Sequence, residues 1–301
     1  DFCLSRGLGD VYKRQAEGFT GWSGVIAGSV FCLLAFAGFE AAAPLAEETE
    51  NPKKNIPKAV MIATVSIGAL YALTTYAAAI TFGPEKFKDF AGYNNGVPWD
   101  GLAKGVGTIF WLLVLFAIIN STIANANGGA NVFTRTAYAF GRAGVFPGKL
   151  AELDPKYKSP RNAVLLQLVV GLALALGLGA KYTPQTAFGI VATGLVVAIV
   201  PVYMIANLAC IGYFSKHRKE DRHPALHMLM PALGFLFLVP GFCNAAGITG
   251  VPGLQFIVAL SSPLTLGAYA MGVWILLGFV TLAYLNKNKP EAIKAVATIH
   301  V

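Results

Sequence analysis

Long apolar stretches separated by short polar segments dominate the sequence. An α-helix needs about 20 apolar residues to cross the hydrocarbon core of a bilayer, and each stretch approaches or exceeds that length. The pattern predicts seven transmembrane helices, at about residues 22–46, 57–83, 102–133, 163–180, 184–213, 228–246 and 254–285. We therefore expect an all-α, multi-pass membrane protein with a transmembrane domain at 16–285 and a tail at 286–301.

The basic residues of the polar segments predict the orientation. Most Lys and Arg residues lie in the loops after the first, third and fifth stretches and in the tail. Cytoplasmic loops of membrane proteins are enriched in these residues, so this side is expected to face the cytoplasm. The prediction is a protein of the cell (plasma) membrane whose C-terminus is cytoplasmic.

Composition supports the membrane class and argues against others. Of the residues, 55% are hydrophobic and 13% charged, against about a quarter charged in soluble domains. The net charge of +8 is spread over short loops, which argues against nucleic acid as a partner. The cysteines have no paired spacing and the histidines lie outside the apolar stretches, so neither a disulfide nor a metal site is expected. No glycine-rich phosphate loop follows a strand; we expect no cofactor and no enzyme activity.

The first fifteen residues differ from the rest of the chain. They lack an initiator Met, and no apolar core follows their charges, so a signal peptide is not indicated. Residues 3–15 resemble a translated adapter sequence. We expect 1–15 to be a non-native leader and the chain to be a fragment.

One acidic residue lies in the inner half of an apolar stretch. Glu40 follows Ala37 and Gly38 and precedes Pro44. Ionisable groups at such depth are costly, and they usually face a cavity or a partner. Gly tolerates unusual backbone angles and Pro removes a donor, so we expect an interrupted helix with free carbonyl groups here. Glu40 is a candidate for proton coupling or, equally, a structural clamp between helices.

The third stretch contains a run of polar and small residues that is too rich for a helix facing only lipid. Small residues permit close helix approach, and amides can form hydrogen bonds across it. Two neighbouring hydroxyls, of Ser121 and Thr122, are a possible ion site, although bonding back to the preceding helical turn is favoured. The run comprises Asn120, Ser121, Thr122, Asn125, Asn127, Gly128, Gly129 and Asn131.

Two segments resemble a known family. Residues 36–40 and 47–59 read FAGFE and EETENPKKNIPKA, similar to the sixth-helix signature of amino acid-polyamine-organocation permeases. Residues 133–147 and 159–163 read FTRTAYAFGRAGVFP and SPRNA, and they resemble the loop between the eighth and ninth helices of that family. With the hydropathy pattern, the resemblance extends over nearly everything after Gln15.

The resemblance implies a fold and a set of site residues. The family has a LeuT-type fold of two inverted five-helix repeats with, usually, two extra helices. This chain then corresponds to helices six to twelve, and the first five helices would be its missing N-terminal half. The resemblance implies that Phe36, Ala37 and Gly38 contact the main-chain groups of the substrate. Many relatives place an aromatic gate where this chain has Leu34, and Phe36 or Phe39 could replace it. Asn127 and Gly129 resemble positions that face the substrate in relatives, and Thr193 is a weaker candidate for a substrate-binding residue.

These observations predict a secondary active transporter for amino acids. We expect it to lie in the lipid bilayer and to bind an amino acid as its substrate. We expect a proton, rather than sodium, as the coupling ion. The alternative is a non-transporting membrane scaffold or a channel, although no repeated ring of pore-lining residues indicates a channel. The isolated fragment is expected to transport nothing without the other half of the site.

Overall fold

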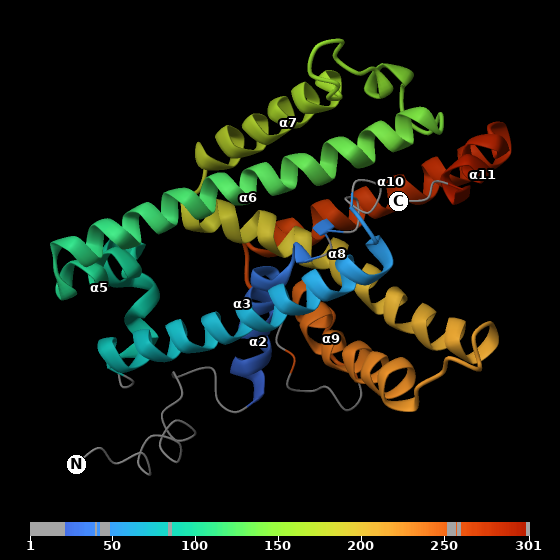
Figure 1. Cartoon of the computed structure of the whole chain (residues 1–301). Helices are drawn as coiled ribbons and strands as arrows, with labels where there is room; N and C mark the ends of the chain where they lie inside the picture. The colour runs from blue at the N-terminus through green and yellow to red at the C-terminus, as the bar shows by residue number, and fades with distance from the viewer. Residues whose placement is uncertain are drawn as a thin grey trace. The chain divides into compact units, whose positions relative to one another are not determined.

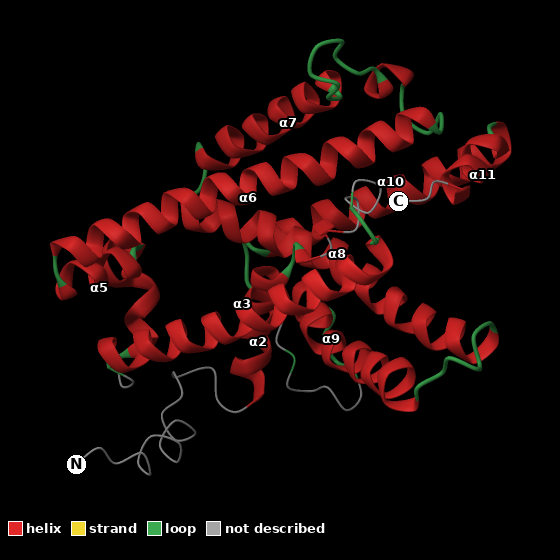
Figure 2. Cartoon of the chain, in the orientation of Figure 1, coloured by secondary structure: helices red, strands yellow, loops and turns green. Residues whose placement is uncertain are grey.

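The computed structural model describes residues 22–39, 41–42, 49–83, 86–251, 257 and 260–298, and helices are the regular elements of this part of the chain (Figures 1 and 2). The longer helices are α2 (Trp22–Phe36), α3 (Pro52–Phe82), α5 (Pro98–Val106), α6 (Thr108–Arg142), α7 (Arg161–Gly179), α8 (Pro184–Lys216), α9 (Met230–Ala246), α10 (Thr265–Asn288) and α11 (Pro290–Thr298). Shorter elements are η2 (Phe87–Gly92), α4 (Tyr93–Gly96), η3 (Gly148–Ala151) and a π-helical turn, η4 (Pro224–Leu229).

Within the described residues, six helices are long and apolar enough to cross a membrane: α3, α6, α7, α8, η4 with α9, and α10. Many of their large apolar side chains are exposed. A helix that is apolar on all sides needs a nonpolar environment, which the acyl chains of a bilayer provide. The chain is therefore a multi-pass membrane protein.

Several helix bounds differ from those predicted. Helix α2 has 15 residues and ends at Phe36, inside the predicted span 22–46. Helix α6 begins at Thr108, because Gly107 has a φ of 148° and separates it from α5, and it continues past residue 133 to Arg142. Helix α10 begins at Thr265, within the predicted span 254–285. The sequence pattern predicted where the apolar stretches lie, whereas the backbone geometry of Gly107 decided where α5 ends and α6 begins.

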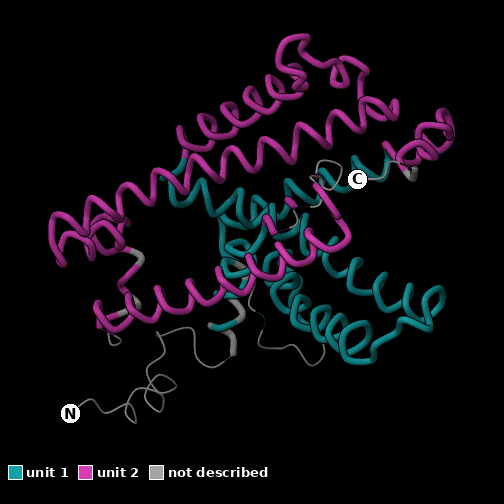
Figure 3. The backbone as a smooth tube through the Cα atoms, in the orientation of Figure 1, with its two compact units in different colours: residues 1–37, 182–280 teal, residues 38–181, 281–301 magenta. Residues whose placement is uncertain are grey.

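The chain divides into two compact units, coloured separately in Figure 3. Unit 1 comprises residues 1–37 and 182–280, and unit 2 comprises residues 38–181 and 281–301. Unit 1 is built on α8, which contacts both α2 and α9. Its core consists of Val196, Val197, Val200 and Ala245, with Leu33 and Leu34 of α2 packed against it.

Glycines bring the helices of unit 1 into close contact. A methyl group on Gly194 of α8 would lie 3.1 Å from the carbonyl oxygen of Gly267 in α10, and one on Gly267 would collide with the carbonyl of Ile190. A methyl group on Gly241 of α9 would lie 2.7 Å from a methyl carbon of Leu33. The contacts of Gly194 and Gly267 are with backbone atoms, and that of Gly241 is with a side chain; both kinds are the close approach that small residues permit between membrane helices.

Unit 2 is more open. Helix α7 lies antiparallel beside α6, α5 packs against the start of α6, and α3 contacts α5 and η2 (Figure 1). Among the long apolar helices of unit 2, the most apolar parts of α3 and α6 are not buried within the protein. These helices are held mainly near their ends, so most of their surface is left for lipid or other helices.

A carboxylate joins α5 to α6. Asp100 accepts hydrogen bonds from Asn94 (2.7 Å), from Lys104 (2.8 Å) and from the indole of Trp111. The hydrogen bond from Lys104, followed by that from Trp111, holds the pKa of Asp100 below its usual value. The carboxylate is therefore charged at neutral pH and fixes the segment before α6 to the first turn of that helix.

Candidate functional site

The predicted site begins where α2 stops. The amide of Ala37 donates to the carbonyls of Leu33 (3.0 Å) and Leu34 (3.1 Å), which closes the helix. Gly38 then adopts a φ of 117°, a conformation that favours glycine because it has no Cβ. The chain continues with a bond from the Ala41 amide to the Gly38 carbonyl (3.0 Å). An interruption after Phe36 thus exists at the place where the sequence predicted one.

The last turn of α2 is fixed by unit 1. Leu33 and Leu34 pack against the valine core of α8, and Leu33 also lies against Gly241 of α9. Leu34 therefore packs in the interior of unit 1, at the position where relatives are expected to place an aromatic gate. The end of α2 has a defined position because two helices hold the turn before it.

The residues around the interruption fall in different units. Phe36 and Ala37 belong to unit 1, whereas Gly38 and Phe39 belong to unit 2. Phe36 and Ala37 are half-buried, and Phe39 is exposed. Glu40, the predicted proton-coupling residue or clamp, lies outside the described residues, and so does Pro44.

The polar run of α6 is exposed in unit 2. Asn127 and Gly129 are both exposed, and a methyl group on Gly129 would meet nothing within 4 Å. Ser121 and Thr122 are also exposed, and the Thr122 hydroxyl donates to the carbonyl of Ile118 at 2.8 Å. The favoured expectation, a bond back to the preceding turn, therefore holds for Thr122. Amides this deep in an apolar helix need a polar cavity, a substrate or another helix.

The third part of the predicted site lies inside unit 1. Thr193 has no exposed surface, and its hydroxyl donates to the carbonyl of Gly189 at 2.9 Å. Thr193 precedes Gly194, which forms the backbone contact with Gly267. The hydroxyl is already satisfied, so this residue fits the packing of α8 against α10 at least as well as a substrate contact.

Two features of unit 1 were not singled out from the sequence. Asn244 of α9 is buried to 1% exposure beside Ala245 of the core, and Gly267 forms the closest helix contact. Asn244 could have been found from the sequence, because it is a single amide in the apolar stretch 230–246. For Gly267 no signal existed, because glycines are frequent in this sequence and the pattern does not show which one meets a neighbouring backbone.

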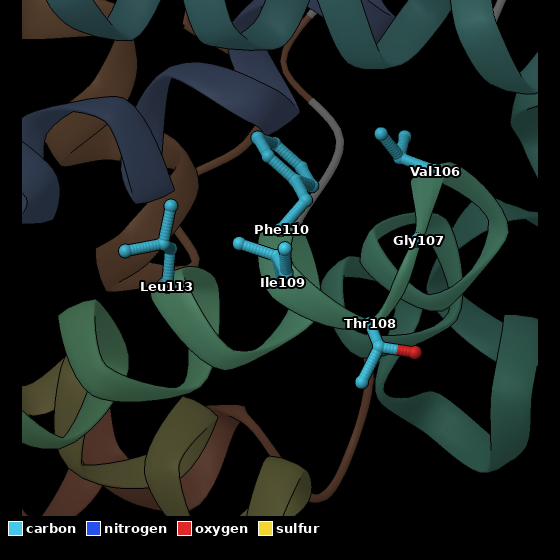
Figure 4. Close-up of a pocket in the computed structure, with 6 residues that line it drawn as sticks. All are labelled: Val106, Gly107, Thr108, Ile109, Phe110 and Leu113. Atoms are coloured by element: carbon cyan, nitrogen blue, oxygen red, sulfur yellow. The ribbon is translucent and has the colours of Figure 1, made fainter.

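A depression at the junction of α5 and α6 lies apart from the predicted residues (Figure 4). Its lining is apolar apart from the hydroxyl of Thr108, and Ile109, Phe110 and Leu113 are exposed along it. Such a surface suits an acyl chain better than a charged amino acid. The lining residues are Val106, Gly107, Thr108, Ile109, Phe110 and Leu113.

The helices and their apolar surfaces define a multi-pass α-helical membrane protein, and its first apolar stretch is interrupted after Phe36. The amino acid permease family model matches residues 6–295, so the chain belongs to the amino acid permease family. The match confirms the family resemblance of the two sequence segments.

Individual relatives are distant. The chain is 27% identical to the branched-chain amino acid permease BcaP of Bacillus subtilis, over 86% of this chain and 50% of that protein. It is 25% identical to BcaP of Lactococcus lactis, over 91% of this chain and 53% of that protein. It is also 25% identical to the low-affinity putrescine importer PlaP of Escherichia coli, over 89% of this chain and 55% of that protein. The chain spans about half the length of these relatives, and no solved structure matches it.

Proposed function

We propose that this chain forms part of a secondary active transporter that moves amino acids across the cell membrane. The observation that carries the proposal is the end of α2 at Phe36, followed by Gly38 at a φ of 117° within an apolar stretch. Interrupted membrane helices free backbone groups to bind a substrate or an ion. Membership of the amino acid permease family supports the same function.

The substrate would lie at this interruption. Phe36, Ala37 and Gly38 would contact its amino and carboxylate groups through the backbone, and Phe39 would pack against its side chain. Asn127 and Gly129 of α6 are proposed as further substrate-binding residues, because the exposed amide needs a polar neighbour in the membrane. Thr193 of α8 remains the weaker candidate, since its buried hydroxyl already donates to the carbonyl of Gly189.

The coupling ion would be a proton. Glu40 is an acidic residue in an apolar stretch, and a carboxylate there can take up and release a proton. A sodium site at Ser121 and Thr122 is the less favoured arrangement, since bonding back to the preceding turn, as from Thr122 to Ile118, accounts for such a hydroxyl without an ion. Glu40→Gln should abolish the stimulation of uptake by an inward proton gradient. Equal stimulation of the variant and the original chain would contradict this role.

The cytoplasmic side would hold the loop between α6 and α7 together with the C-terminal tail. The side chain of Ala292 in α11 lies 3.9 Å from the position of a methyl group on Gly144 in that loop. Both segments belong to unit 2, so their proximity supports placing them on the same side of the membrane; the cytoplasmic assignment rests on the basic residues.

Uptake measurements test the proposal. The purified chain is reconstituted into liposomes, alone and together with the half of Bacillus subtilis BcaP that it does not match. Uptake of leucine, lysine and putrescine is then measured with and without a proton gradient. We expect uptake only when both halves are present, because a transporter of this class builds its site from two repeats. Co-purification of the two parts establishes that they assemble.

Asn127→Ala should raise the KM for uptake, and Asn288→Ala is the matched control. The Asn288 side chain donates to the carbonyl of Tyr284 near the end of α10, away from the predicted site residues in sequence. Assembled halves that transport none of the three substrates would contradict a carrier and favour the scaffold. Ion currents that do not saturate with substrate would favour a channel.

A further inference from the structure

The loop between α6 and α7 contains a turn with an exposed aromatic ring between two lysines. One carboxylate oxygen of Asp154 accepts hydrogen bonds from the amides of Lys156 and Tyr157, both at 2.9 Å. The Lys158 amide donates to the Asp154 carbonyl at 2.9 Å, and Lys158 has a φ of 54°. Side-chain-to-backbone bonds of this kind fix a turn without a longer element.

Further contacts fasten the loop to the two helices. The side-chain amide of Asn162 in α7 donates to the carbonyl of Lys149 at 2.7 Å and to the carboxylate of Glu152 at 3.2 Å. Gly141 of α6 lies so close to η3 that a methyl group there would be 3.0 Å from the Ala151 amide nitrogen. The turn therefore projects from a connection that is anchored to both helices of the hairpin.

The exposed surface of the loop is basic and partly apolar. The Tyr157 side chain is 72% exposed, and the ammonium group of Lys156 lies 5.0 Å from the centre of its ring. Leu153 is also exposed. Lys149, Lys158 and Arg161 add three positive charges, while the two acidic residues of the loop, Glu152 and Asp154, are hydrogen-bonded within it.

We infer that this turn binds the headgroups of anionic phospholipids, with Lys156 and Lys158 on the phosphate and Tyr157 at the level of the glycerol backbone. The turn connects two helices that span the membrane, so it lies next to the headgroup layer. In the proposed orientation this layer is the cytoplasmic leaflet, where anionic lipids attract basic segments. Tyrosine is enriched at the same depth because its ring is apolar and its hydroxyl polar.

The pre-formed turn distinguishes this site from a general excess of positive charge. Lysine side chains lose conformational freedom when they bind a headgroup, but the backbone between them is already ordered by Asp154. Asp154 therefore acts as a positioning residue: its carboxylate oxygen should favour binding by ordering the turn, even though its negative charge repels an anionic ligand. A surface that works by charge alone would behave in the opposite way.

Lipid titration of the purified 301-residue chain in detergent, followed by native mass spectrometry, tests the inference. The probes are phosphatidylglycerol and phosphatidylcholine. Lys156→Gln with Lys158→Gln should weaken the apparent affinity for phosphatidylglycerol by about fivefold for each lysine removed. Binding of phosphatidylcholine should not change. The matched control is Lys287→Gln with Lys289→Gln, which removes the same charge near the end of α10.

Substitutions of Asp154 test separately whether the ordered turn contributes to lipid binding. Asp154→Ala raises the net charge but removes the acceptor of the turn, so we expect weaker binding of phosphatidylglycerol. Asp154→Asn keeps an oxygen acceptor, so this variant should bind phosphatidylglycerol as the original chain does. Stronger binding by Asp154→Ala, or equal losses in the two lysine pairs, would overturn the inference. Neither measurement involves uptake, so the result is independent of the proposed transport function.

Discussion

Two long membrane helices, α8 of unit 1 and α6 of unit 2, differ in how they place their polar residues. Helix α8 has 33 residues and buries Thr193 together with the glycines and valines around it. Helix α6 has 35 residues, and its amide-rich centre is exposed in its own unit. Both helices are strongly apolar, so the difference lies in their neighbours. A tightly packed helix satisfies its own hydroxyls, whereas the exposed amides of α6 remain available to bind something polar.

The largest expected effect comes from the helix contact in unit 1. Gly267→Ala places a methyl group against the carbonyl of Ile190, so α8 and α10 must separate. We expect a loss of about 3 kcal/mol in the free energy of unfolding, seen as a lower melting temperature in detergent. Gly272→Ala on the same helix is the control, because its methyl group would meet nothing within 4 Å. Equal melting temperatures for the two variants would contradict the contact.

A second comparison sets core packing against lipid-facing surface. Val200 of α8 has no exposed surface, whereas Val169 of α7 is 64% exposed. Val200→Ala should cost about 2 kcal/mol because it leaves a cavity in the core of unit 1. Val169→Ala should cost little, since acyl chains fill the space. Similar costs, measured by thermal unfolding in the same lipid, would mean that the surface of α7 is covered by protein.

The third comparison concerns two threonines that bond to their own helices. Thr193→Val removes the buried bond to Gly189, and we expect a loss of about 1 kcal/mol. Thr122→Val removes the equivalent bond to Ile118 on the exposed face of α6 and should be neutral. Melting temperatures measure both. A marked loss for Thr122→Val would show that its hydroxyl binds a group beyond its own helix.

The smallest expected effect is a pH dependence in unit 2. The hydrogen bonds from the amides of Tyr157 and Lys156 lower the pKa of Asp154 from its usual 3.8. A lowered folded-state pKa means that the carboxylate stabilises the loop above pH 3.8. This contribution decreases as the pH falls further, through the folded-state value. Hydrogen exchange at these amides, corrected for its intrinsic pH dependence, should accelerate in that range, and Asp154→Asn should remove the acceleration.

Local sequence signals predicted much of the molecule. The apolar stretches predicted the long helices, and Gly38 and Pro44 on either side of Glu40 predicted the interruption, because the backbone properties of glycine and proline are local. The two family segments predicted the permease family. Helix ends were less predictable. Gly107 ended α5 by its backbone angle, and α6 continued past the predicted end at residue 133 to Arg142.

The burial of particular residues depended on long-range contacts. Thr193 and Asn244 are polar residues in apolar stretches, as Asn127 is, yet the first two are buried and the third is exposed in its unit. Their immediate sequences do not distinguish them. The distinction arises because α8 and α9 pack against each other and against α2, whereas most of the polar run of α6 stays exposed within unit 2.

The sequence by itself determined that this protein belongs in a membrane, which family it belongs to and where its first apolar helix is interrupted. Those properties follow from apolar length, motif residues and the conformational freedom of glycine, all of which act over a few neighbouring positions. Only the tertiary structure decided that Gly267 meets Ile190 and that the Thr193 hydroxyl is enclosed. Close packing joins residues far apart in the chain, and an apolar sequence pattern does not specify which surfaces meet.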